Sequence, residues 1–107
     1  MIMKAYKLDG KNVVECSFDE SLSITNRQIA RNTFGEVEIS TVFLIFDHSY
    51  DSDKPVLFET MIFGGEHDGY QDRYHTYDEA LIGHQLACDL VNRIPIERDN
   101  KLNDLGI

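Results

Sequence analysis

Residues 37–63, VEISTVFLIFDHSYDSDKPVLFETMIF, decide the fold of this chain. They contain two runs rich in β-branched and aromatic residues, 37–47 and 56–63, joined by a polar stretch that closes at Pro55. Residues of the first kind favour strands, whereas polar residues followed by proline favour a connection. The stretch therefore predicts a central antiparallel hairpin.

Shorter patterns on both sides of this hairpin add further elements. Residues 2–8 and 11–17 flank Asp9-Gly10, a pair that tolerates the positive φ angles of a tight turn, so they predict an N-terminal hairpin. Ser17 with Glu20 matches a capping box and predicts a short helix over residues 18–25. Further strands are expected over residues 27–34 and 70–75.

The clearest helix is TYDEALIGHQLACDLVNRI, residues 76–94. Thr76 and Glu79 form a second capping box, and Pro95 ends the helix. The expected fold class is α+β, a mostly antiparallel sheet of about five or six strands with one main C-terminal helix. We expect a single domain over residues 1–95 and a charged, loosely held tail over residues 96–107.

Composition limits the function. Ten basic and nineteen acidic residues give a formal net charge of −9, which argues against binding to phosphate backbones as the main activity. The same charge permits a surface that imitates nucleic acid or meets a basic partner. No apolar run approaches the ~20 residues that cross a bilayer, and residues 1–11 lack the apolar block of a signal peptide. Cys16 and Cys88 are expected as reduced, buried thiols in a cytosolic protein, or as one disulfide if the fold brings them together.

The pairing of the central hairpin determines which side chains share a face. With residues 42 and 60 opposite each other, both faces are mostly apolar, and the single long helix covers only one. The second face needs the rest of the sheet, a ligand or a second subunit to cover it. We therefore predict a homodimer or higher homo-oligomer, with a coiled sheet that covers itself as the alternative.

Two ionisable residues lie in apolar surroundings. With this pairing Glu59 lies among Phe43, Ile45 and Met61, where it is either a ligand- or metal-facing carboxylate beside Asp47 or half of a structural ion pair with Arg73. His84 lies within the apolar stripe of the helix. It is either a hydrogen-bonded core histidine or, with His48, a ligand or proton carrier.

Other polar groups give weaker signals. The stretches DHSYDSD and EHDG have neither HExxH nor EF-hand spacing, so solvated loops compete with a metal site. Gly64-Gly65 presents N–H groups to an anion or forms a turn. Tyr70, Tyr74 and Phe63 either stack on a base, with Arg73 facing a phosphate, or pack. No nucleophile signature is present, and we predict no catalytic residue, metal or cofactor.

Residues 40–84 resemble a recurrent family of small bacteriophage and prophage proteins. The resemblance rests on the blocks TVFL-x-x-DH, LFETM-x-FGG and RY-x-T-x-x-EA-x-x-GH, and more loosely on NRQIAR upstream. Ile45 stands where this family usually has glycine. The resemblance implies phage origin and expression in the cytoplasm of the bacterial host, rather than a particular chemistry. Its blocks carry over these residues: Asp47, His48, Glu59, Thr60, Gly64, Gly65, Arg73, Tyr74, Thr76, Glu79, Gly83 and His84.

These observations lead to the hypothesis of a non-enzymatic phage accessory protein that binds and neutralises a host factor. The favoured form captures a small nucleotide-like immune signal at a subunit interface, because polar groups in an apolar pocket orient ligands. The expected ligand-binding residues are Asp47, His48, Glu59, Thr60, Gly64, Gly65, Arg73, Tyr74 and His84. The alternatives are an acidic inhibitor of a host defence protein that imitates nucleic acid, and a metal-dependent hydrolase. No direct nucleic-acid binding or membrane partner is expected.

Overall fold

The computed structural model describes residues 4–49 and 53–93. Its elements confirm the predicted α+β class, a mostly antiparallel sheet with one main C-terminal helix. The predicted tail, residues 96–107, lies outside the described residues. In chain order the elements are β1 (Ala5–Asp9), β2 (Asn12–Cys16), α1 (Phe18–Ser21), β3 (Gln28–Phe34), β4 (Val37–Phe43), β5 (Phe58–Phe63), β6 (Gln71–Tyr74) and α2 (Tyr77–Asn92).

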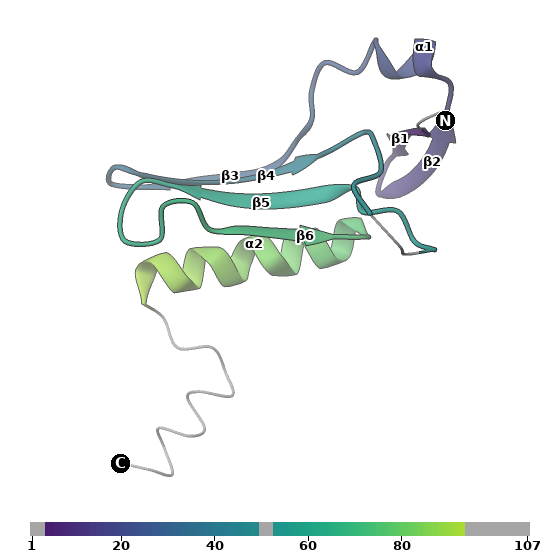
Figure 1. The fold of residues 1–107 in the computed structure, drawn as a ribbon. Helices are drawn as coiled ribbons and strands as arrows, with labels where there is room; N and C mark the ends of the chain where they lie inside the picture. The colour runs from purple at the N-terminus through teal and green to yellow at the C-terminus, as the bar shows by residue number, and fades with distance from the viewer. Residues whose placement is uncertain (1–3, 50–52, 94–107) are drawn as a thin grey trace.

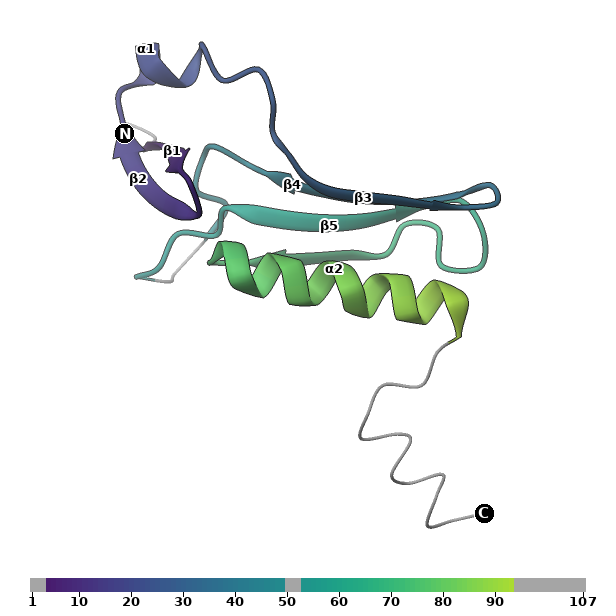
Figure 2. The same ribbon diagram turned by 180° about the vertical axis from the view of Figure 1, so that it is seen from behind.

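The strands form two separate antiparallel sheets. β1 and β2 make the predicted N-terminal hairpin, and the other four strands pair in the order β3-β4-β5-β6. Figures 1 and 2 show α2 along one face of the four-stranded sheet, with the hairpin at the end where α2 begins. The Tyr6 amide donates to the Ile45 carbonyl over 2.8 Å and ties the hairpin to the loop after β4.

The sequence signals at both helix starts correspond to real caps. Thr76 Oγ1 accepts from the Glu79 amide, and the Glu79 carboxylate accepts from the Thr76 amide, both over 3.1 Å. At α1 only half of the box forms, because Ser17 accepts from the Glu20 amide while the Glu20 carboxylate bonds Lys7 instead. In the part of the chain that the structure describes, no helix is long and apolar enough to cross a membrane.

The pairing of β4 with β5 differs from the expected one. Val42 lies opposite Glu59, and Thr41 opposite Thr60, one residue away from the predicted pair 42 and 60. A shift of one residue exchanges the faces of one strand relative to the other. The prediction of two mostly apolar faces was therefore wrong, and Glu59 lies on the side of Val42 rather than of Phe43.

The core lies between α2 and the face of the sheet that it covers. Ile39, Phe43, Phe58 and Ile62 are 2% exposed or less and pack toward the buried stripe of α2. Cys88 is buried in this core, and Cys16, half-buried in the N-terminal hairpin, is likewise a free thiol. No described helix or strand covers the opposite side of the sheet, which we call the open face (Figure 1).

β4 ends at Phe43, four residues before the predicted end of the strand. Ile45 follows in the left-handed region with φ 71°, and the Phe46 amide donates back to the Leu44 carbonyl over 2.8 Å. A β-branched residue is strained there, whereas glycine is not. Burial of the Ile45 side chain, which is 7% exposed, offsets this strain.

Candidate functional site

The open face combines apolar side chains with charges that cancel in pairs. Arg73 Nε lies 2.8 Å from Glu59 Oε2, and Arg31 Nη2 lies 2.8 Å from Glu38 Oε1. Each pair joins neighbouring strands of the sheet. The open face is thus electrically neutral on a chain whose net charge is −9. Its members are Gln28, Arg31, Thr33, Glu38, Ser40, Val42, Glu59, Met61, Phe63, Gln71 and Arg73.

Glu59 is the most enclosed charge of this face. Its side chain is 12% exposed, against 38% for Arg73, and its Oε2 also accepts from Gln71 Nε2 over 2.6 Å. Two donors on one carboxylate oxygen hold the side chain of Glu59 in place on the sheet. The structural ion pair with Arg73, one of the two predicted roles of Glu59, is therefore confirmed.

A shallow depression of about 60 Å³ lies beside Glu59, lined by Ser40, Val42, Met61 and Phe63. Phe63 is 46% exposed, and Val42 and Met61 are half-buried. The depression is too small to enclose a ligand, since small-molecule pockets usually measure several hundred cubic ångströms. It is a shallow depression in the open face, and the surface of another protein can cover that face.

Three of the predicted ligand residues, Thr60, Tyr74 and His84, lie on the opposite side, between the sheet and α2. His84 is 6% exposed and lies 2.8 Å (Nε2) from Asn32 Oδ1 and 2.7 Å (Nδ1) from Thr41 Oγ1. Because Asn32 Oδ1 only accepts, Nε2 carries the proton and Nδ1 accepts from Thr41. His84 is thus a neutral, hydrogen-bonded core histidine, and burial lowers its pKa.

The hydrogen bonds of His84 continue across the sheet. The Thr41 hydroxyl, which donates to His84, accepts in turn from the hydroxyl of Thr60, and both threonines are fully buried. Beyond Thr60, the Tyr74 hydroxyl is buried without a hydrogen-bond partner. Burial raises the pKa of Tyr74, while the nearby Thr60 hydroxyl acts in the opposite direction. This row of polar groups runs from the buried hydroxyls of Tyr74, Thr60 and Thr41 through His84 to Asn32, which is exposed, and it positions the helix on the sheet.

Asp47 and His48 lie in the loop between β4 and β5. Asp47 Oδ1 accepts from the amides of Ser49 and Val56, each over 2.8 Å, and Oδ2 accepts from the Ser49 hydroxyl over 2.9 Å. Burial opposes ionisation of Asp47, but these hydrogen bonds prevail and lower its pKa. Asp47 therefore closes the loop. The His48 side chain is exposed, and the His48 amide donates to the Val56 carbonyl over 3.0 Å.

Gly64 and Gly65 form the turn after β5, at the other end of that strand from Asp47. Both have positive φ, and a Cβ on Gly64 would lie 2.8 Å from the Glu36 carbonyl oxygen. The Gly64 amide donates to Asp68 Oδ1 over 2.6 Å, so a carboxylate of the same chain occupies it and it is not available to a bound anion. The prediction of a turn at this glycine pair is confirmed.

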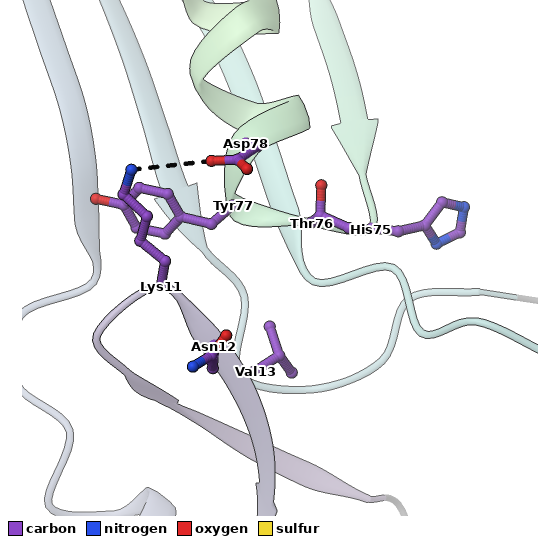
Figure 3. A pocket seen from close by; sticks show the side chains of 7 residues that line it. All are labelled: Lys11, Asn12, Val13, His75, Thr76, Tyr77 and Asp78. Carbon is purple, nitrogen blue, oxygen red and sulfur yellow. Dashed lines mark ion pairs between the residues drawn. The ribbon is translucent and has the colours of Figure 1, made fainter.

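A cleft of about 280 Å³ lies between the tip of the N-terminal hairpin and the start of α2 (Figure 3). There Lys11 Nζ lies 3.9 Å from Asp78 Oδ1 and 5.8 Å from the centre of the Tyr77 ring. These contacts attach the hairpin to the helix. The side chain of His75 points away from them, toward Pro55, whose carbonyl oxygen lies 3.0 Å from Nδ1.

The structure thus brings the predicted ligand residues together in separate groups rather than at one site. Glu59 and Arg73 share the open face, the group of Thr60, Tyr74 and His84 lies in the interior, and the remaining four lie in loops at opposite ends of β5. Among residues 4–49 and 53–93, no three His, Cys, Asp or Glu side chains converge as metal ligands.

Sequence reasoning missed Asn32, Thr41 and Gln71, which complete the two hydrogen-bonded groups. Alternating residues of 37–43 share a face of the strand, which places Thr41 with Ile39 and Phe43 on the apolar face. A polar residue at such a position was the available signal for Thr41. Asn32 and Gln71 carry no such signal, because only the pairing of the strands brings them to His84 and Glu59. In comparisons with protein-family models, curated proteins and solved structures, nothing matches this chain.

Proposed function

We propose that this chain is a non-enzymatic phage accessory protein that binds and neutralises a host factor in the cytoplasm of the bacterial host, and that the open face is its binding surface. The observation that carries the proposal is a neutral, partly apolar sheet face on a strongly acidic chain. The phage origin rests on the three sequence blocks in residues 40–84.

The chemistry of the open face suits a protein partner. The centres of protein interfaces are poor in unpaired charge and rich in aromatic residues, methionine and arginine. Met61 and Phe63 supply the apolar contact, and Arg73 is already neutralised by Glu59. A partner that covers this face therefore buries no unpaired charge from this chain.

A nucleotide-like ligand fits less well. A cleft of about 280 Å³ lies beside the acidic start of α2. A second cleft, of about 260 Å³, is lined by Arg73, but the carboxylates of Asp72 and Glu79 line it as well and disfavour a phosphate there. A phosphate group that approached Arg73 would have to displace the carboxylate of Glu59. Between the two forms of the hypothesis, we therefore propose a host protein rather than a small immune signal.

The two alternative functions find less support in the described residues. Imitation of nucleic acid needs acidic side chains on the binding surface, whereas both acidic residues of the open face are paired with arginine. A metal-dependent hydrolase would need four side chains together, those of Asp47, His48, Glu59 and His84. Three of them, Asp47, Glu59 and His84, belong to separate hydrogen-bond networks.

The test is capture of host proteins from a bacterial lysate with immobilised wild-type protein and two variants. Phe63→Asp changes the most exposed aromatic of the open face, and Leu22→Asp is the matched control, an exposed apolar residue next to α1. We expect one host protein that wild type and L22D retain and F63D loses, with similar melting temperatures for all three.

Three other results would each contradict a part of the proposal. Equal capture by F63D would show that the binding surface lies elsewhere on the protein. The absence of specific capture by wild type would contradict the proposed binding of a host protein. A melting temperature raised by nucleotides would favour the hypothesis that the protein captures a small nucleotide-like molecule. Capture lost between about 0.05 and 0.5 M salt, where screening becomes strong, would favour imitation of nucleic acid.

We also propose that the protein is a homo-oligomer, most simply a dimer. The described chain leaves several large apolar side chains exposed, among them Ile82, Leu86 and Leu90 of α2. Closed two-fold pairing is the commonest way in which soluble chains bury such groups. The mass in solution, against 12.3 kDa for one chain, tests this part independently of host capture.

A further inference from the structure

The outer side of α2 carries an apolar stripe that no described residue covers. Ile82, Leu86 and Leu90 are 63%, 44% and 37% exposed. At about 100° per residue, they fall with Glu79 within an arc of about 80° on the helix surface, and Arg93 follows the last helical residue as the left-handed C-cap, with φ 59°. We call these five residues the α2 ridge. It is apolar in the middle, with an acidic residue near the start of the helix and a basic residue at its end.

A cleft runs beside the ridge. It measures about 260 Å³. Its lining comes from α2 and from β6 with the residue after it: Glu79, Ile82, Gly83 and Leu86, and Asp72, Arg73, Tyr74 and His75. A raised row of side chains next to a depression is the surface form that two packed helices use, because the side chains of each helix enter the grooves of the other. The surface therefore suits a second helix.

The neighbouring edge of the sheet is less suited to an added strand. The Arg73 amide of edge strand β6 donates to the Asp72 carboxylate over 2.9 Å, so it is not available to another backbone. A charged side chain that occupies an edge amide is a common protection against strand addition. The ridge, not the edge, is the part of this side that can take a partner.

We propose that the occupant is α2 of a second copy of this chain, packed antiparallel across a two-fold axis at Leu86. Residues equally distant from Leu86 then face each other. Ile82, four residues before it, meets Leu90 of the second copy, four residues after it. Glu79, seven before, meets Arg93, seven after. A parallel arrangement would instead place Glu79 against Glu79, so the charges of the ridge favour the antiparallel one.

Both charged ends of the ridge are able to make these contacts. Glu79 Oε1 accepts the capping hydrogen bonds from His75 and Thr76, which leaves Oε2 as an acceptor. Arg93 pairs with Glu66 at 3.0 Å, but the two side chains are 79% and 64% exposed. Such exposed pairs contribute little and exchange readily. Two intermolecular Glu79–Arg93 pairs would flank the apolar centre.

This inference rests on the proposed homo-oligomer and names its surface. The contact runs along about 21 Å of helix and is small for a protein interface, so we expect a dissociation constant on the order of micromolar. It leaves the open face uncovered, because α2 packs on the other side of the sheet. A dimer would carry two open faces and bind a multivalent host factor more tightly than one chain does.

The experiment is sedimentation equilibrium of the full chain from about 1 µM to about 1 mM, the range that brackets the expected affinity. Wild type should pass from one to two times 12.3 kDa. Leu86→Glu, which places two carboxylates at the axis, should remain a monomer at every concentration. The matched control Leu81→Glu changes an apolar residue of similar exposure on the other side of α2 and should dimerise like wild type.

Charge variants test the antiparallel arrangement. Arg93→Glu faces Glu79 of the second copy and should weaken dimerisation about tenfold or more. Adding Glu79→Gln, which retains the capping box, should recover part of that loss. In a parallel dimer Arg93 would face Arg93, so Arg93→Glu would change the affinity little, and Glu79→Gln alone would strengthen the dimer instead of weakening it.

A monomeric wild type at the highest concentration would overturn the dimer. A dimer that persists in L86E would overturn the ridge as its surface. Host capture that depends on Phe63 is unaffected by either result, so the failure of this inference and the failure of the proposed binding function are distinguishable. Melting temperatures show that each variant is folded.

Discussion

The phenol ring of Tyr74 occupies the space where a side chain at position 83 would begin. A Cβ built on Gly83 would overlap the hydroxyl and ring carbons of Tyr74. Glycine therefore lets α2 approach β6 closely enough to bury the end of the Tyr74 side chain. The glycine and the tyrosine have to be considered together.

The first prediction concerns this pair. Alanine normally stabilises a helix interior by about 1 kcal/mol relative to glycine, but here it collides with the Tyr74 ring. We expect Gly83→Ala to lower the free energy of unfolding by roughly 1–3 kcal/mol, as overpacked cores do. In a Tyr74→Ala background the collision is absent, so the same change should be neutral or stabilising. Urea unfolding of the four proteins of this cycle measures the coupling, and additive effects would show that the two residues are independent.

The second prediction concerns pH. Burial lowers the pKa of His84 below the 6.5 of an exposed histidine, so the unfolded chain binds more protons between the two pKa values. The contribution to stability is complete above pH 6.5 and is lost as the pH falls through the folded pKa. We expect the free energy of unfolding to fall as the pH drops from about 7 to about 5.

A variant separates His84 from the carboxylates. Those of Asp47 and Glu79 have lowered pKa values and affect stability only below about pH 4.5. His84→Gln should be less stable than wild type at pH 7 by roughly 2–3 kcal/mol, because Thr41 and Asn32 lose well-aligned hydrogen bonds to the imidazole ring. The stability of this variant should not change between pH 7 and pH 5. An unchanged slope in the variant would assign the titration to another group.

Local patterns predicted most of the elements correctly. Capping boxes, an Asp-Gly turn and runs of β-branched residues act over a few residues, so the sequence itself contains them. The bounds of α2, Tyr77–Asn92, differ little from the predicted 76–94 for this reason. The same holds for the neutral His84, which its place in the apolar stripe indicated.

The pairing of β4 with β5 could not be read in this way. Fourteen residues separate Phe43 from Phe58, and the turn of the chain at Ile45 takes residues 44–47 out of the strand. Alternation within one strand does not specify which residue of the next strand lies opposite. The pairing also decides which polar groups meet, since it brings Thr60 beside Thr41 on the face under α2 and Glu59 beside Arg73 on the open face.

The third prediction concerns the loop that Asp47 closes. Asp47→Ala removes three hydrogen bonds and leaves the amides of Ser49 and Val56 without their acceptor. We expect a loss of roughly 2–3 kcal/mol, and about half of that for Asp47→Asn, which keeps one acceptor oxygen. Because the pKa of Asp47 is lowered, wild type should lose this advantage as the pH falls below about 4. Chemical denaturation at pH 7 and pH 3 measures both, and a constant difference between wild type and D47N would contradict the ionised role.

The last prediction uses the strained backbone at Ile45. Glycine in a strand or ordinary loop is normally less stable than alanine by about 0.5–1 kcal/mol, because it loses more freedom on folding. At φ 71° an alanine keeps the strain of a left-handed residue, whereas glycine relieves about 1 kcal/mol or more of it. Both variants lose the same burial of Ile45 in the core beside Leu57 and Phe58. We therefore expect Ile45→Gly to be at least as stable as Ile45→Ala.

Ile39 provides the control for this inversion. It is fully buried in the middle of β4, where φ is negative, so Ile39→Gly should be less stable than Ile39→Ala in the usual order. The comparison needs only the difference within each pair, which cancels the cost of the lost isoleucine. If alanine is the more stable variant at both positions, residue 45 is not held in the left-handed region. If the order is inverted only at position 45, the buried side chain of Ile45 holds the backbone in a conformation that suits glycine.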